Sequence, residues 1–157
     1  MARRKRVYTK PERRDPKFDS PVVGRLISKV MKDGKRSLSE RIVYAAIDRA
    51  NEGTDTIDPL EILTRAIENA KPRVEVKSRR VGGATYQVPL EVDAARSESL
   101  GMRWIIGFAR AKKGTPMHVA LANEIKDAAN NTGASVRKRD DVHKMAQANR
   151  AFAHFRF

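Results

Sequence analysis

Apolar residues recur at intervals of three and four along most of the chain, a spacing that places them on one face of a helix. Short runs containing glycine, proline or asparagine interrupt this pattern and end one helix before the next begins. The sequence therefore predicts six amphipathic helices, over residues 21–33, 38–52, 59–70, 94–113, 116–129 and about 135–153.

Residues with known capping preferences stand at the ends of these segments. Pro21 follows a serine, as expected for the first position of a helix. Glu40 and Glu61 each lie three residues after a possible N-cap, which is the spacing of a capping box. Ile57 can staple onto Ile62. The predicted N-caps are Ser20, Ser37, Asp58 and Asp93, and the predicted C-terminal caps are Gly34, Gly53 and Gly114.

The apolar stripes define a candidate core. Gly101 and Gly107 interrupt the fourth stripe, and we expect both to mark close packing against a neighbouring element. The stripes include Val23, Leu26, Ile27 and Val30, then Leu38, Ile42, Val43 and Ile47, then Ile62, Leu63 and Ile67, then Leu100, Trp104, Ile105 and Phe108, and finally Leu121 and Ile125.

The segment from Lys71 to Leu90 breaks the helical pattern. It contains two extended runs joined by Gly82 and Gly83, which predicts a β-hairpin because glycine reaches the positive φ angles of a two-residue turn. Such a turn pairs Val81 with Ala84, Arg80 with Thr85 and Arg79 with Tyr86. The base can dock on a core through Val74, Val76, Val88 and Leu90, whereas the cationic tip around Lys77, Arg79 and Arg80 has no face suited to burial.

The predicted fold is mainly α: a single domain of about six helices with one projecting β-hairpin at about 73–90 and an extended basic arm over residues 1–17. A chain of 157 residues with 40% hydrophobic residues is long enough to bury one core. The arm lacks apolar periodicity and contains two prolines, so we expect little structure of its own.

Charge changes the picture from fold to function. The net charge is +14 at pH 7, which indicates a nucleic-acid partner or, less often, an anionic membrane. The charge is uneven: residues 1–17 carry a net +6 and residues 71–90 a net +4, whereas residues 42–70 carry a net −4. The second and third helices are therefore expected to face solvent or protein.

Several function classes find no support in the sequence. There is no cysteine, so disulfides and cysteine-ligated zinc are excluded. The three histidines lie apart without ligand spacing, and no phosphate loop, nucleophile elbow or paired-carboxylate motif is present. We therefore expect neither an enzyme nor a cofactor or metal site. No apolar run is long enough for a membrane span.

The arrangement of cations favours folded RNA. Arg79 across from Tyr86 offers a guanidinium and a ring that can stack on unpaired bases, although ordinary cross-strand packing is the favoured interpretation of Tyr86. The alternative is an architectural DNA-binding protein that uses a basic β-arm. Such arms usually carry a proline wedge near the tip, and this tip is Val-Gly-Gly-Ala.

Two long stretches and the C-terminal end carry a specific similarity. Residues 20–46 contain Leu26-Ile27, then Gly34-Lys35-Arg36, then Ile42-Val43. The hairpin reads KPRVEVKSRRVGGATYQVPLEV, and the chain ends in ANRAFAHFRF. Together they resemble the bacterial form of small-subunit ribosomal protein seven, an rRNA-binding family of the subunit head. The similarity extends over essentially the whole chain.

The resemblance implies a helical bundle with a projecting β-ribbon, in agreement with the pattern. It implies primary binding to the 3′ major domain of small-subunit rRNA, nucleation of head assembly, and a place at the exit site near tRNA and mRNA. The implied rRNA contacts are Arg3, Arg4, Lys5, Arg6, Lys10, Lys35, Arg36, Lys77, Lys112 and Lys113. The implied exit-site residues are Arg79, Arg80, Val81, Gly82, Gly83, Tyr86, Arg137, Lys138, Arg139 and Arg150.

The implied partners are small-subunit rRNA, exit-site tRNA and mRNA, and the neighbouring small-subunit proteins nine and eleven. Archaeal and eukaryotic relatives carry a long N-terminal extension that this sequence lacks. We therefore expect a ribosome of bacterial type, in the cytoplasm or in an organelle.

Overall fold

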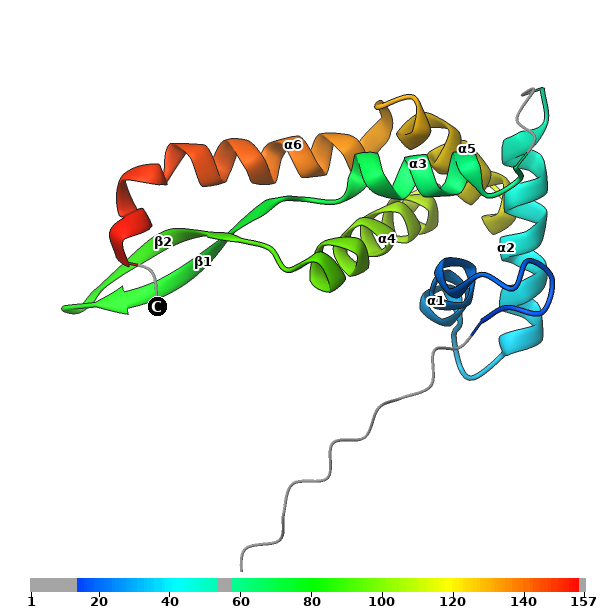
Figure 1. Cartoon of the computed structure of the whole chain (residues 1–157), viewed down its shortest axis with the longest axis horizontal. Helices are drawn as coiled ribbons and strands as arrows, with labels where there is room; N and C mark the ends of the chain where they lie inside the picture. The colour runs from blue at the N-terminus through cyan, green and yellow to red at the C-terminus, as the bar shows by residue number, and fades with distance from the viewer. Residues whose placement is uncertain (1–13, 54–57, 156–157) are drawn as a thin grey trace, which may run out of the picture.

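A computed structural model describes residues 14–53 and 58–155 (Figure 1). Within these ranges the chain forms six α-helices, one 3₁₀-helix and one two-stranded sheet. The elements are α1 (Pro21–Val30), α2 (Arg36–Asn51), α3 (Glu61–Ala70), β1 (Val74–Val81), β2 (Ala84–Glu91), α4 (Ala94–Ala111), α5 (Met117–Ala129), α6 (Gly133–Ala148) and η1 (Arg150–Phe155). The prediction of a mainly helical domain with one hairpin is confirmed.

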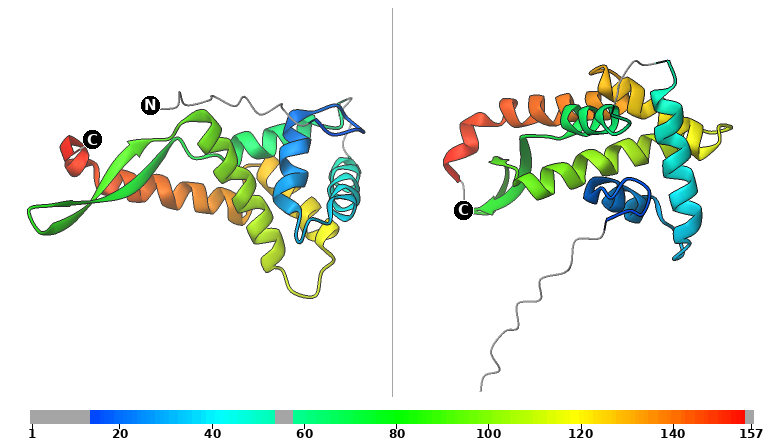
Figure 2. Two further views of the ribbon diagram at one scale, coloured as in Figure 1. Left: turned by 90° about the horizontal axis from the view of Figure 1, so that it is seen from below. Right: turned by 45° about the vertical axis from the view of Figure 1, so that its right-hand side comes forward.

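Helix α5 lies at the centre of the helical body and contacts α2, α3, α4 and α6, while α1 packs on α2 and α4. The hairpin and α6 leave this body side by side, and the hairpin projects beyond it (Figures 1 and 2). Fully buried side chains such as Leu26, Ile47, Ile105, Leu121 and Ile125 form a single core cluster.

The buried face of α4 differs from the predicted one. Met102 and Ile106 are buried with Ile105, whereas Trp104 and Phe108 are only half-buried. The apolar stripe of α4 is wide enough to include all of these residues. The sequence alone cannot show which part of the stripe faces the core, because that depends on which helices lie alongside. The contact with α5 decides the orientation here.

Two predicted helix starts are confirmed. Ser20 Oγ accepts a hydrogen bond from the Val23 backbone N–H at 3.5 Å, with Pro21 at the first helical position. The Asp93 carboxylate accepts from the backbone N–H of Ala95 at 3.2 Å.

The two predicted capping boxes are wrong. Helix α2 begins at Arg36, one residue before Ser37, so Ser37 is not its N-cap. The Glu40 carboxylate instead accepts a hydrogen bond from Arg36 Nε at 2.8 Å. Helix α3 begins at Glu61, because the Asp58 carboxylate accepts from the Leu60 N–H at 2.8 Å and closes a turn ahead of the helix. Ile57, the predicted staple residue, lies outside the described residues.

The predicted glycine C-caps lie in the turns beyond the helices. Helix α1 ends at Val30 and α4 at Ala111, while Gly34 and Gly114 adopt φ angles of +72° and +74° a few residues later. Their positive φ angles reverse the chain direction between helices. The glycine signal is therefore correct for the turn but not for the last helical residue.

The last helix is shorter than predicted. It ends at Ala148, where Asn149 Nδ2 donates to the Met145 carbonyl at 2.8 Å, and the chain then turns into η1. In Figure 1 this final segment, drawn in red, folds back toward the hairpin. Contacts between η1 and β2 explain the break, because a continued helix would carry residues 150–155 away from the hairpin.

The last residues of the predicted arm fold onto the body. Asp15 is 1% exposed, and its carboxylate accepts from the backbone N–H groups of Lys17, Phe18 and Ser20. Lys17 Nζ also lies 3.0 Å from an Asp48 carboxylate oxygen. The chain is thereby anchored before α1 begins.

The hairpin has the predicted register. Val81 pairs with Ala84, Arg80 with Thr85 and Arg79 with Tyr86. Gly82 and Gly83 have φ angles of +55° and +93°, which is the geometry that glycine supplies in a two-residue turn. At the base, Val88 is buried, while Val74, Val76 and Leu90 are half-buried.

Candidate nucleic-acid interface

The hairpin carries two exposed cations, one on each face, because Lys77 and Arg80 are three positions apart along β1. Lys77 and Arg80 are exposed and form no ion pair with any described residue, and Arg80 lies opposite Thr85. The tip glycines Gly82 and Gly83 are also exposed, with Val81 half-buried beside them. The face that carries Arg80, together with the tip, is available to a polyanion.

The face that carries Arg79 and Tyr86 is partly covered by the C-terminal segment. Tyr86 is half-buried, and its ring centroid lies 5.2 Å from that of Phe152 and 5.0 Å from that of Phe155. Arg79 Nη1 donates to the Phe155 carbonyl. Contrary to the expectation that the tip has no face suited to burial, Arg79 and Tyr86 are half-buried, because the C-terminal aromatic residues supply an apolar surface from about 70 positions away in sequence.

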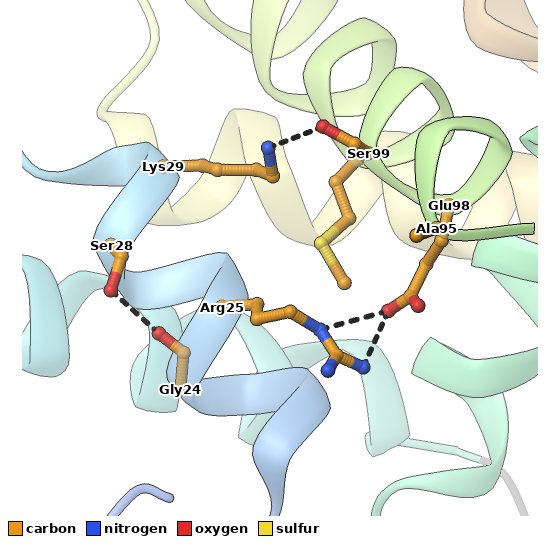
Figure 3. Close-up of a pocket in the computed structure, with 8 residues that line it drawn as sticks. Gly24, Arg25, Ser28, Lys29, Ala95, Glu98 and Ser99 are labelled. Atoms are coloured by element: carbon orange, nitrogen blue, oxygen red, sulfur yellow. Dashed lines mark hydrogen bonds and ion pairs between the residues drawn. The ribbon is translucent and has the colours of Figure 1, made fainter. Parts of the chain in front are cut away.

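A cationic groove, formed by Arg25, Lys29, Arg103 and Arg110, lies between α1 and α4. These residues line two adjoining hollows whose remaining walls include Ser28, Ser99 and Gly107. Among the described residues that line them, Glu98 is the only carboxylate. It accepts from Arg25 Nη2 at 2.8 Å (Figure 3). The groove therefore keeps a surplus of positive charge.

Lys29 reports the electrostatic character of this groove. Burial lowers the pKa of the Lys29 ammonium, and the nearby Arg103 guanidinium lowers it further. Lys29 Nζ lies 2.8 Å from Ser99 Oγ, as Figure 3 shows, so its neighbour in the groove is a neutral hydroxyl. Burial and a nearby like charge both disfavour the charged form of a lysine, and a nearby anion favours it. A phosphate at this position would restore the pKa.

The sequence holds a signal for this groove that single-helix reasoning does not use. Arg25 and Lys29 are four residues apart, and Arg103 and Arg110 are seven apart, so each pair lies on one face of its helix. Lys29 also lies in the last turn of α1, where a cation complements the helix dipole. Only the packing of α1 against α4 brings the two pairs together.

The turn between α1 and α2 adds a second basic corner. Lys35 is exposed and lines a shallow hollow together with Lys32 and Arg110. Leu38, predicted to be buried, is 43% exposed in the same hollow. Arg36, the other predicted contact, is held by Glu40 through an ion pair of 2.8 Å. Lys35 is therefore the freer of the two cations.

Lys112 and Lys113 differ in environment. Lys112 Nζ lies 3.4 Å from a carboxylate oxygen of Glu124, which is 1% exposed. The other Glu124 oxygen accepts from the Ser135 N–H and hydroxyl, both at 3.0 Å. Lys112 thus compensates a buried charge between α5 and α6, while Lys113 is exposed. A loss of Lys112 would leave a buried carboxylate without its cation.

The three cations at the start of α6 also divide. Arg137 and Lys138 are exposed. Arg139 donates to the Asp140 carboxylate, to the Asn69 carbonyl and to Asn131 Oδ1, and so ties α6 to the end of α3. Arg150 is exposed at the start of η1. The predicted contacts Arg3, Arg4, Lys5, Arg6 and Lys10 lie outside the described residues.

No group of three or more metal-ligating side chains occurs within residues 14–53 and 58–155. His143 instead has a structural role, because its Nε2 accepts the Arg73 backbone N–H at 3.0 Å. The described part of the chain likewise has no helix that is long and apolar enough to cross a membrane.

Comparison with known proteins decides what this basic surface belongs to. The sequence model of ribosomal protein S7p/S5e matches residues 2–150. The chain belongs to the ribosomal protein S7p/S5e family. It is 83% identical to the small ribosomal subunit protein uS7 of Akkermansia muciniphila over the full length of both chains. It is 52% identical to uS7 of Fervidobacterium nodosum, covering 99% of each chain, and 52% identical to uS7 of Mycobacteroides abscessus, covering all of each chain.

Membership of the S7p/S5e family confirms the resemblance that the hairpin and the residue 20–46 stretch carry. The family consists of structural, non-enzymatic, RNA-binding proteins of the small ribosomal subunit, so the expectation that the chain is not an enzyme is confirmed. Family membership supports small-subunit rRNA as a partner and the small ribosomal subunit as the location.

Proposed function

We propose that this chain is a primary binder of the 3′ major domain of small-subunit rRNA and nucleates assembly of the subunit head. The observation that carries the proposal is the cationic groove, in which four cations from α1 and α4 line adjoining hollows with one carboxylate. Clustered cations bind the RNA backbone through its phosphates and release counterions. Further rRNA contacts are proposed for the exposed Lys35, Lys77 and Lys113, and for Arg3–Arg6 and Lys10, which lie outside the described residues.

The test is a titration of a folded 3′-domain rRNA fragment with the double variant Lys29→Ala and Arg103→Ala at several salt concentrations. We expect weaker binding, and a slope of log K against log salt concentration that is smaller in magnitude by about 1.8, since each phosphate contact contributes about 0.9 to the slope on a DNA duplex. Arg41→Ala with Arg49→Ala is the matched control, because both arginines are exposed on α2, outside the groove. Equal slopes in the two double variants would overturn the proposal.

We also propose that the hairpin and the start of α6 form the exit-site side, near tRNA and mRNA. The hairpin projects beyond the helical body (Figure 2), and its exposed Arg80, with Arg137, Lys138 and Arg150, can meet an RNA backbone. Arg79, Tyr86 and Arg139 would support this surface through their internal contacts. Reconstituted subunits with Arg80→Ala should retain exit-site tRNA less well; unchanged retention would contradict this placement.

The small-subunit proteins nine and eleven are the proposed protein neighbours. A partly exposed apolar surface, formed by Val76, Leu100, Trp104, Val142 and Met145, supports a protein contact beside α4 and α6. Met145 is 51% exposed, unusual for so large an apolar side chain. Replacing Met145 by Lys should weaken binding of one of these two proteins in a reconstituted subunit; full binding of both would contradict the proposal.

A further inference from the structure

A cleft separates the base of the hairpin from α6 and η1, away from the cationic groove. Its apolar walls come from Val74 and Pro89 of the hairpin and from Ala146 and Ala153 of the C-terminal segments. Arg73 and Arg150 also line it, together with His143 and Gln147. The cleft therefore combines an apolar interior with polar groups contributed from two sides.

The junction between the two walls is fixed by a backbone contact. His143 Nε2 accepts the Arg73 N–H at 3.0 Å, so the chain entering β1 is attached to α6 at this point. Because Nε2 is the acceptor, the neutral ring carries its proton on Nδ1. The two walls are thereby joined at this contact.

The charge of the cleft is wholly positive as far as the structure describes it. The side chains of Arg73 and Arg150 are exposed, and neither forms an ion pair with a described residue. No carboxylate occurs among the described residues that line the cleft. Two unpaired guanidinium groups beside an apolar wall suit a ligand that is anionic at one end and flat and apolar at the other.

We propose that this cleft binds an unpaired nucleotide of single-stranded RNA. The base enters between the hairpin and α6, and Arg73 and Arg150 hold its flanking phosphates. Guanidinium groups bind phosphate with paired N–H donors, and apolar surfaces accept the face of any base. Gln147 supplies a donor and an acceptor for a base edge. The inference rests on the proposed RNA-binding function and assigns it a second site, specific for unpaired nucleotides.

The test uses fluorescence anisotropy of the full chain with a labelled six-residue oligouridylate, and with the same oligomer made abasic. Arg73→Gln with Arg150→Gln should weaken binding and lower the magnitude of the salt slope by about 1.4, since each single-strand phosphate contact is worth about 0.7. Ala153→Leu fills the cleft without changing charge. It should weaken oligouridylate binding, because the base loses the apolar surface that covers it, and leave binding of the abasic oligomer unchanged.

Arg41→Gln with Arg49→Gln is the control, because it removes the same charge from exposed positions on α2. Equal losses in both arginine pairs would overturn the proposal in favour of general charge attraction. Equal binding of the abasic and intact oligomers would overturn it in favour of a phosphate site. Each variant is also titrated with the folded 3′-domain fragment: retained binding shows that it is folded and that the proposed function stands, whereas failure of the unaltered chain to bind that fragment would count against the proposed function itself.

Discussion

Arg79 of β1 donates a hydrogen bond to the backbone carbonyl of Phe155, the last residue of η1. Tyr86, which faces Arg79 across the ladder, packs its ring against Phe155 and Phe152. Helix η1 is thereby attached to both strands of the hairpin. An isolated two-stranded ribbon is marginally stable in water, so this attachment is expected to hold the hairpin in one orientation.

The first prediction removes the aromatic part of this attachment. Phe152→Ala with Phe155→Ala should increase amide hydrogen exchange over residues 79–87, because each aromatic pair contributes about 0.5–1.5 kcal/mol beyond its buried area. The helical core should keep its protection, since η1 contributes no buried residue. Hydrogen-exchange mass spectrometry measures both regions. Leu38→Ala, at an exposed apolar position on α2, is the control, and equal hairpin exchange in both variants would refute the attachment.

The second prediction separates two adjacent arginines. Arg79→Ala should raise hydrogen exchange in η1, because the Phe155 carbonyl loses its donor. Arg80→Ala should leave η1 unchanged, since Arg80 is exposed opposite Thr85. Both variants should remain folded and lose one positive charge. If the two variants exchange alike in η1, Arg79 has no structural role.

Local pattern was sufficient for much of this fold. The hairpin register follows from Gly82-Gly83 alone, and the Ser20 and Asp93 caps follow from side chains within three residues. Features that depend on residues far away in the sequence could not be predicted from local pattern. The burial of Tyr86 requires aromatic residues from η1, and the orientation of α4 requires its contact with α5.

The candidate site divides along the same line. Exposed cations such as Lys35, Arg80 and Arg137 could be recognised by type, but sequence could not separate them from Lys112 and Arg139, whose charges serve internal contacts. The cationic groove could not be predicted from the sequence, because its two pairs of cations lie about 80 positions apart. Whether a cation binds RNA or stabilises the fold depends on the groups that lie next to it in the folded chain.

The third prediction concerns pH. Burial, and then the charge of Arg139, lower the pKa of His143 below the ordinary histidine value of 6.5. The unfolded chain therefore takes up a proton at a higher pH than the folded chain. Stability is fully present above about pH 6.5 and should fall as the pH drops below it, until the folded-state pKa is passed. Protonation also removes the acceptor for the Arg73 N–H.

His143→Gln tests this origin, because glutamine retains a possible acceptor and does not titrate. Chemical denaturation between pH 5 and pH 8 should show a smaller loss of stability in acid for His143→Gln than for the unaltered chain. His118→Gln, on α5, should keep the original pH dependence. An unchanged dependence in His143→Gln would assign the acid loss to other groups.

The fourth prediction uses two glycines of the same helix. A Cβ at Gly101 would lie 3.3 Å from the Lys71 backbone Cα and N, which cannot move like the end of a side chain. A Cβ at Gly107 would meet no described atom within 4 Å. The expectation of close packing is therefore confirmed for Gly101 and wrong for Gly107. Gly101→Ala should be less stable than Gly107→Ala, because overpacking costs about 1–3 kcal/mol against a helix-propensity gain of up to about 1 kcal/mol that both variants share.

Gly107→Ala should stabilise the protein. It adds helix propensity of up to about 1 kcal/mol at a position with open space beside it. Gly107 also lines the cationic groove next to Arg103 and Arg110, so a methyl group there should reduce rRNA affinity while the free energy of unfolding rises. Thermal denaturation and rRNA titration of the two variants separate these effects. Increased stability with unchanged affinity would show that RNA does not approach the α4 backbone at Gly107.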